Sequence, residues 1–381
     1  MKKDLRISPW ETVLFLAAVL LPLWPLTKLM PEDPPLPVGI FILVSYAALL
    51  LLFFLVRFFA MLLHETGHLV CGLASGFRFS YLQVWPFRLS RLDGRFKLSL
   101  TQASDVGLCG MLPPEAPRSL WLYYLGGVLA NGLGCLLGLA GFLCTPLQGF
   151  WHWVLLSFCL QNLALALING LPLRFLSVDV DGLRVQCLLR SPFARQAQRD
   201  IYRVGALFYT TRLRDMPEEL FYLPQGAELQ NRVSLYPGLN LVLRTLDQHR
   251  FAEAASLAGW LEAKAALSVY ERFSLRDLQI YCALLAGADI RPYETPGQQK
   301  LLRRYLRSSP SVVRTQYARA LLWNQNPVEA NALLGQFERL AKNLSPMELQ
   351  GERELIAIAY TAWLERTGQA PQQPAPQGPC Q

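Results

Sequence analysis

Residues 38–76 read VGIFILVSYAALLLLFFLVRFFAMLLHETGHLVCGLASG, an apolar run that is interrupted by Arg57 and by the segment His64–His68. A helix needs about 20 apolar residues to cross about 30 Å of hydrocarbon. Written as one helix, this stretch would be about 60 Å long, twice that thickness. The run therefore predicts a membrane helix that is kinked or strongly tilted and that carries two histidines and a glutamate on adjacent turns.

Three further stretches of the first half contain no charged residue, at 12–27, 120–143 and 154–168. The last reaches spanning length when its uncharged flanks are included, and the first is near the lower limit of about 17 residues. Residues 183–367, by contrast, are rich in Arg, Glu and Gln. We therefore expect about four transmembrane helices followed by a water-soluble part.

The cations of the short loops predict the orientation, because Lys and Arg stay on the cytoplasmic side of a membrane. The N-terminus carries Lys2, Lys3 and Arg6, whereas the loop at 31–37 is acidic and has no cation. A cluster of cations lies between the second and third apolar runs: Arg78, Arg88, Arg91, Arg95, Lys97 and Arg118. We expect an integral protein of a bacterial cytoplasmic membrane, with both termini in the cytoplasm and the His-Glu-His group in the inner half of the bilayer or at its edge.

The net charge of +8 does not indicate nucleic acid. The cations flank the apolar runs, as they do in proteins that contact a lipid bilayer, and no nucleic-acid-binding motif occurs. The expected partners are therefore the bilayer and other proteins, and not DNA or RNA.

Residues 77–101 alternate between apolar and polar side chains, and Asp93-Gly94 suits a tight hairpin turn. This pattern predicts a β-hairpin beside the membrane. From about residue 195 the pattern becomes one amphipathic helix after another, with helix pairs at 239–248 with 250–262 and at 312–323 with 327–342. Such pairs are typical of tetratricopeptide-like repeats.

The predicted fold is thus an all-α polytopic membrane protein with a membrane-associated β-hairpin, followed by a soluble α-helical repeat domain. The expected parts are an N-terminal helix and acidic external loop (1–36), a membrane core (37–190), a cytoplasmic helical domain (195–367) and a disordered tail rich in Pro and Gln (368–381).

The segment His64-Glu-Thr-Gly-His68 has the HExxH spacing of zinc proteases. Residues four apart lie on one helix face, so both imidazoles reach one metal ion, while Glu65 is aimed at the metal-bound water as general base. Three ionisable residues this close together in lipid are costly unless they serve a function. We therefore predict that His64 and His68 bind Zn²⁺ and that Glu65 is catalytic.

A catalytic zinc usually has three protein ligands and an open position, so a third ligand must come from elsewhere. Asp179 and Asp181 are the acidic residues near the end of the fourth apolar run, on the same predicted side as His64. Cys71 is another candidate, because positions 64, 68 and 71 share a helix face. The residues by themselves leave these three open.

The chain resembles the site-2 proteases, a family of intramembrane zinc metalloproteases, over about residues 40–190. The resemblance rests on four segments: His64–His68 in an apolar helix, Ala74-Ser-Gly-Phe-Arg-Phe, Gly126-Gly-Val-Leu-Ala-Asn131, and Asn169-Gly-Leu-Pro172 followed by Asp181-Gly182. It implies that Asp181 is the third zinc ligand and that Asn131 positions substrate. Val128 departs from the proline usual at its place in the family. The resemblance also implies that an unwound substrate could add as a strand to the hairpin.

The expected function is therefore hydrolysis of a peptide bond in or near a transmembrane segment, with a transmembrane protein or membrane-associated peptide as substrate. The helical domain is expected to bind a protein partner or to gate access. One alternative is a catalytically inactive relative that binds a membrane partner or peptide. Another is a zinc transporter or sensor, which would need more polar residues along its spans than the third run offers.

Overall fold

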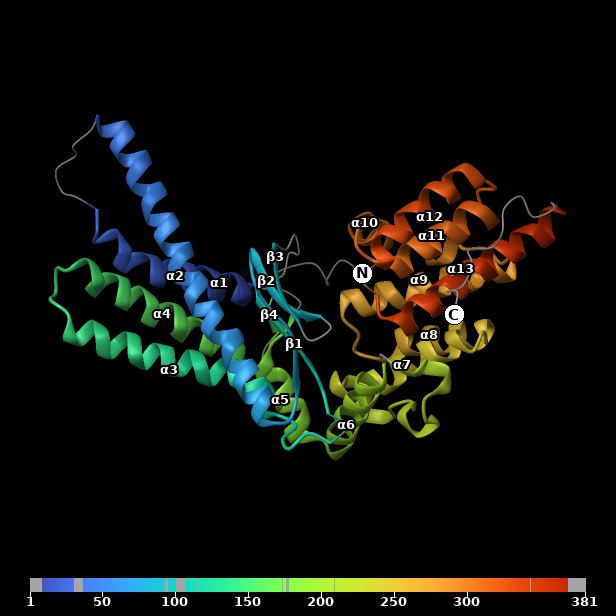
Figure 1. Cartoon of the computed structure of the whole chain (residues 1–381), viewed down its shortest axis with the longest axis horizontal. Helices are drawn as coiled ribbons and strands as arrows, with labels where there is room; N and C mark the ends of the chain where they lie inside the picture. Colours follow the sequence, from blue (N-terminus) through green and yellow to red (C-terminus); the bar gives the residue numbers. More distant parts are fainter. Residues whose placement is uncertain are drawn as a thin grey trace. The chain divides into compact units, whose positions relative to one another are not determined.

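The computed structural model describes residues 9–30, 37–92, 95–100, 107–114, 116–172, 174–175, 178–208, 210–342 and 344–368. The chain forms two compact units, Met1–Arg199 and Asp200–Gln381 (Figure 1). The predicted turn at Asp93-Gly94, the acidic loop at 31–36 and the tail after residue 368 lie outside the described residues. Each unit is described separately below.

The first unit contains the helices α1 (Pro9–Thr27), α2 (Val38–Ala74), α3 (Leu122–Cys144) and α4 (Phe150–Gly170). Among the described residues, three helices are long and apolar enough to cross a membrane, and they correspond to α2, α3 and α4. The apolar part of α1, Leu16–Thr27, is shorter. α1 lies against α4, where Ser157 donates a hydrogen bond to the carbonyl of Pro22 (2.7 Å). The expectation of four spans is thus met for three.

α2 is one continuous helix of 37 residues. In Figure 1 it crosses α3 and α4 obliquely. Glycines permit this close crossing, because a Cβ at Gly67 would collide with the carbonyl of Gly126, and a Cβ at Gly126 with that of Gly67. Backbones can approach this closely in lipid only where side chains are absent. The glycines therefore allow α3 to pack closely against α2.

The predicted hairpin is part of a four-stranded antiparallel sheet. Its strands are β1 (Arg78–Val84), β2 (Phe87–Leu92), β3 (Arg95–Leu100) and β4 (Gly107–Leu112), in the order β3-β2-β1-β4. The hairpin prediction is right for β2 and β3. It did not include β4, which pairs with β1 across an irregularity at Phe79–Tyr81. Phe96, Leu98 and Leu100 of β3 expose large apolar side chains on one face of the strand.

The end of the first unit brings the chain back to α2 and α3. After α4 come the short strands β5 (Arg174–Phe175) and β6 (Val178–Asp179), then α5 (Asp181–Arg190) and α6 (Pro192–Leu207). Gly182 allows α5 to begin against the end of α4, because a Cβ there would collide with the carbonyl of Gly170. This close approach fixes where the first residue of α5, Asp181, lies.

All the regular elements described in the second unit are helices. Its elements are η1 (Leu213–Asp215), η2 (Glu218–Leu220), η3 (Gly226–Gln230), η4 (Val233–Leu235), α7 (Tyr236–Asp247), α8 (Phe251–Lys264), α9 (Val269–Ala286), η5 (Arg291–Tyr293), α10 (Pro296–Tyr305), α11 (Pro310–Leu322), α12 (Pro327–Ala341) and α13 (Pro346–Thr367). The two predicted helix pairs correspond to α7 with α8 and α11 with α12. Side-chain caps explain where several of these helices begin. At the start of α9, Ser268 and Glu271 form a reciprocal capping box. The tetratricopeptide character of the pairs stays a prediction.

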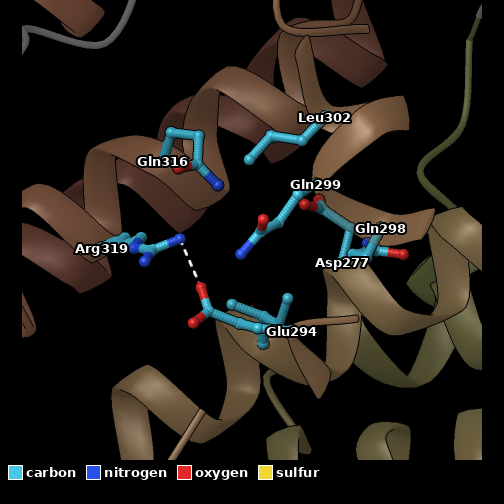
Figure 2. A pocket seen from close by; sticks show the side chains of 8 residues that line it. Asp277, Glu294, Gln298, Gln299, Leu302, Gln316 and Arg319 are labelled. Atoms are coloured by element: carbon cyan, nitrogen blue, oxygen red, sulfur yellow. Dashed lines mark ion pairs between the residues drawn. The ribbon is translucent and has the colours of Figure 1, made fainter. Parts of the chain in front are cut away.

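The core of this second unit contains a buried carboxylic acid, Asp277 of α9, which accepts a hydrogen bond from Thr315 of α11 (2.8 Å). It lies at the side of a small pocket between α9, α10 and α11, where Arg319 pairs with Glu294 (2.6 Å; Figure 2). Burial raises the pKa of Asp277 to about 7, although the Thr315 hydrogen bond and the charge of Arg314 lower it. The acid is therefore largely protonated below neutral pH.

Asp277→Asn is expected to remove a pH dependence of stability. An unfolded Asp titrates near about pH 4, so between that value and about 7 the folded unit binds the extra proton and loses stability as the pH rises. The free energy of opening of α9, measured by hydrogen exchange at about pH 5.5 and about pH 8, should fall by on the order of 2 kcal/mol more in the wild type than in the variant. Asp289→Asn, which changes an exposed acid, should behave like the wild type. Equal slopes in all three proteins would contradict the prediction.

Candidate metal centre

The three predicted ligands, His64, His68 and Asp181, meet at one point of the first unit. The Nε2 atoms of the two histidines are 3.2 Å apart, and Asp181 Oδ2 lies 3.5 Å from His64 Nε2 and 3.3 Å from His68 Nε2. Among the described residues, these three form the one group of side chains that could hold a metal ion. Both histidines are buried and Asp181 is partly exposed, so the group opens on the Asp181 side.

The spacing of these atoms fits a tetrahedral ion. Zinc bonds to imidazole nitrogen and carboxylate oxygen are about 2.0–2.2 Å long, which puts neighbouring ligand atoms about 3.3–3.6 Å apart. The observed separations of 3.2, 3.3 and 3.5 Å are close to that value. Two nitrogens and one carboxylate oxygen are also the donor set of a zinc site with one position left open.

Hydrogen bonds on the far side of each ring set the tautomers. His68 Nδ1 donates to the carbonyl oxygen of Tyr123 (2.8 Å), and His64 Nδ1 donates to Asn131 Oδ1 (2.5 Å). Each Nδ1 therefore carries the hydrogen, and each Nε2 presents its lone pair to the shared centre. Partners of this kind are typical of metal-ligating histidines.

Asn131 contacts the far side of the His64 ring. It is fully buried, and its amide nitrogen donates to the carbonyl of Ala60 (3.1 Å) and to Asn162 Oδ1 (2.8 Å). Asn162 in turn donates to the carbonyl of Phe158 (2.8 Å). The amide of Asn131 thus orients His64, and its role in positioning substrate stays a prediction. The sequence reasoning missed Asn162, although an amide inside an apolar span was a signal.

Asp181 reaches the histidines because α5 starts beside α3 and α4. Burial raises the pKa of Asp181, but when the two imidazoles are protonated, their hydrogen bonds and charges outweigh burial and hold the pKa at about 2. The carboxylate is therefore ionised at neutral pH, as a metal ligand must be.

Glu65 lies beside the cluster and is buried. Its carboxylate accepts a hydrogen bond from the backbone N–H of Cys109 in β4. Gly107, at the start of the same strand, is close enough that a Cβ there would lie 2.5 Å from Glu65 Oε1. The edge strand β4 thus runs past the carboxylate, a contact that could not be expected without the strand.

Gly127 of α3 leaves the space that the two imidazoles occupy. A Cβ there would lie 2.5 Å from His64 Cε1 and 2.6 Å from both Nε2 atoms. Gly127→Ala is therefore expected to push the rings apart and to weaken zinc binding by about a hundredfold, measured by competition with a chelator. Gly132→Ala is the matched control, because a Cβ there meets nothing within 4 Å. Equal zinc affinity in the two variants would contradict the prediction.

Cys71 and Asp179 were the two other candidates for the third ligand. Cys71 does not join the cluster, and its side chain packs beside Gly126 where α2 and α3 cross. The backbone of Asp179 belongs to β6, but its side chain lies outside what the structure describes. The geometry therefore favours Asp181 over Cys71.

Comparison with protein-family models, curated proteins and solved structures finds no match for this chain. The resemblance to the site-2 proteases consequently stays a prediction from the motifs. The geometry of the cluster is independent of that resemblance, because it joins residues from α2 and α5 that lie far apart in the sequence.

Proposed function

We propose that this chain is an intramembrane zinc metalloprotease of the site-2 type. The observation that carries the proposal is the convergence of His64 Nε2, His68 Nε2 and Asp181 Oδ2 beside Glu65. The two histidines and Glu65 belong to α2, a helix of membrane-spanning length and composition. Three ligands with one open position are the arrangement of a hydrolytic zinc site, whereas structural zinc sites have four protein ligands.

The roles of the residues follow from their positions. Bound zinc would polarise the scissile carbonyl and lower the pKa of the attacking water. Glu65 takes a proton from that water and returns it to the leaving amine. Asn131 and the carbonyl of Tyr123 hold the imidazoles in the required orientation. The ionised carboxylate of Asp181 completes the ligand set.

The substrate would be a transmembrane protein or a membrane-associated peptide. Its helix must unwind locally, because helical carbonyls are already hydrogen-bonded. The sheet supports this proposal, because it brings a strand to the site: the edge strand β4 donates the Cys109 N–H to Glu65, and the Cys109 carbonyl accepts a hydrogen bond from the Tyr123 hydroxyl. If α1 is the fourth crossing, both termini lie in the cytoplasm, the site faces inward and the helical second unit is available to a protein partner.

The decisive test measures zinc content and cleavage together on the purified full-length protein in detergent. We expect zinc in the wild type and cleavage of a generic transmembrane substrate, with activity lost on chelation and restored by added zinc. Zinc without cleavage of any transmembrane substrate would favour the inactive, peptide-binding relative. A protein that binds no zinc would exclude the metal site altogether.

A further inference from the structure

Arg57 is a charged residue in the middle of α2. It is the one charged residue between Val38 and Leu63, within the longest candidate span. It is half-buried, and no hydrogen bond or ion pair joins it to any residue that the structure describes. A cation without a partner among the described residues is costly at such a position, and intramembrane ionisable residues usually bind something.

Arg57 lies on the catalytic face of its helix. Residues seven apart in a helix are about 20° apart around the axis and about 10 Å apart along it, which places Arg57 two turns before His64. Met61 fills the turn between them. A Cβ at Gly107 of β4 would touch both Met61 Sδ (2.7 Å) and Glu65 Oε1 (2.5 Å). Arg57, Met61 and Glu65 therefore form a row, at a spacing of four residues, whose last two members contact β4.

The depth of Arg57 separates it from lipid phosphates. Ala60 lies one turn from Arg57, and its carbonyl accepts a hydrogen bond from Asn131 of α3, so the two residues lie at the same depth. Asn131 is nine residues beyond the start of α3 at Leu122. That is about 13 Å along the helix, and Arg57 lies about one turn deeper. This level is near the middle of α3, far from either headgroup layer.

We propose that Arg57 recognises a carboxylate of the substrate and so determines its specificity. This inference rests on the proposed function. The guanidinium fork matches a carboxylate in two hydrogen bonds, and the pairing is strong where water is scarce. An extended substrate rises about 3.3 Å per residue, so about 10 Å corresponds to an acid about three residues from the scissile bond. The preferred substrate is therefore an apolar membrane segment with one acidic group near the cleavage site.

The test compares transmembrane peptides that carry a single Asp, or Asn in its place, about two to five residues to either side of the cleavage site. We expect the wild type to cleave the Asp peptide about thirtyfold faster in kcat/KM than the Asn peptide at one register. Arg57→Gln should lose this preference while keeping its zinc and its rate on the Asn peptide. Arg57→Glu should prefer a Lys peptide. Arg91→Gln, which removes an exposed cation from β2, should keep the wild-type preference.

Peptides that end at the preferred register, with a free or an amidated terminus, distinguish a terminal carboxylate from an acidic side chain, and a preference for either supports the inference. Equal cleavage of Asp and Asn peptides at every register, or an Asp preference that survives Arg57→Gln, would overturn it. If Arg57→Gln loses zinc, Arg57→Lys replaces it and should retain part of the preference.

A binding measurement separates this inference from the proposed function. Zinc-loaded Glu65→Gln protein should bind the Asp peptide more tightly than the Asn peptide. The double variant that also carries Arg57→Gln should bind the two peptides equally. If the wild type cleaves nothing but this difference exists, the protease proposal fails while the carboxylate site at Arg57 stands. If the wild type cleaves peptides and binding shows no difference, the Arg57 site fails and the protease proposal stands.

Discussion

Glu65→Gln is expected to keep its zinc and to lose about 10³-fold in kcat on a transmembrane substrate. Gln has nearly the size of Glu and can still accept the hydrogen bond from the Cys109 N–H, so the packing against β4 should persist. It cannot accept a proton from the attacking water. The metal ligands are unchanged, so zinc content measured on the purified protein should equal that of the wild type.

The matched control is Glu253→Gln, which makes the same chemical change at an exposed position of α8. It should retain both zinc and activity. If Glu65→Gln cleaved at the wild-type rate, Glu65 would not be the general base. A loss of both zinc and cleavage in Glu65→Gln would instead indicate that the side chain supports the metal site itself.

Asp181→Ala should lose zinc and, with it, all metal-dependent cleavage. The substitution removes one of three protein ligands and the only anionic one, and leaves two imidazole nitrogens 3.2 Å apart with no carboxylate between them. Two neutral ligands hold zinc far more weakly than three that include a charge. Metal analysis after dialysis, alongside cleavage, measures the effect.

Asp179→Ala is the informative companion, because the sequence left both acids open as the third ligand. It should keep its zinc if Asp181 is the ligand. The opposite result, with zinc lost in Asp179→Ala and retained in Asp181→Ala, would reverse the assignment. Asp181→His is a third variant to test, because an imidazole at the start of α5 can bind zinc in place of the carboxylate if the protein is correctly folded.

Much of the membrane unit could be read directly from its residues. The length of the apolar runs predicts α2, α3 and α4, because the cost of placing polar groups in hydrocarbon is local to each run. The spacing of His64 and His68 predicts their shared helix face for a similar reason, since helical periodicity is a local property. The helix pairs of the second unit follow from the same periodicity.

The sequence by itself thus determined which segments are helical and which two histidines and glutamate belong together on α2. Tertiary structure alone decided what meets them: the Asp181 carboxylate from α5, the Asn131–Asn162 pair behind His64, the Cys109 N–H of β4, and the gap at Gly127. Each of these is a contact between elements far apart in the chain. Their positions depend on how closely helix backbones pack, which the glycines permit and which no local pattern encodes.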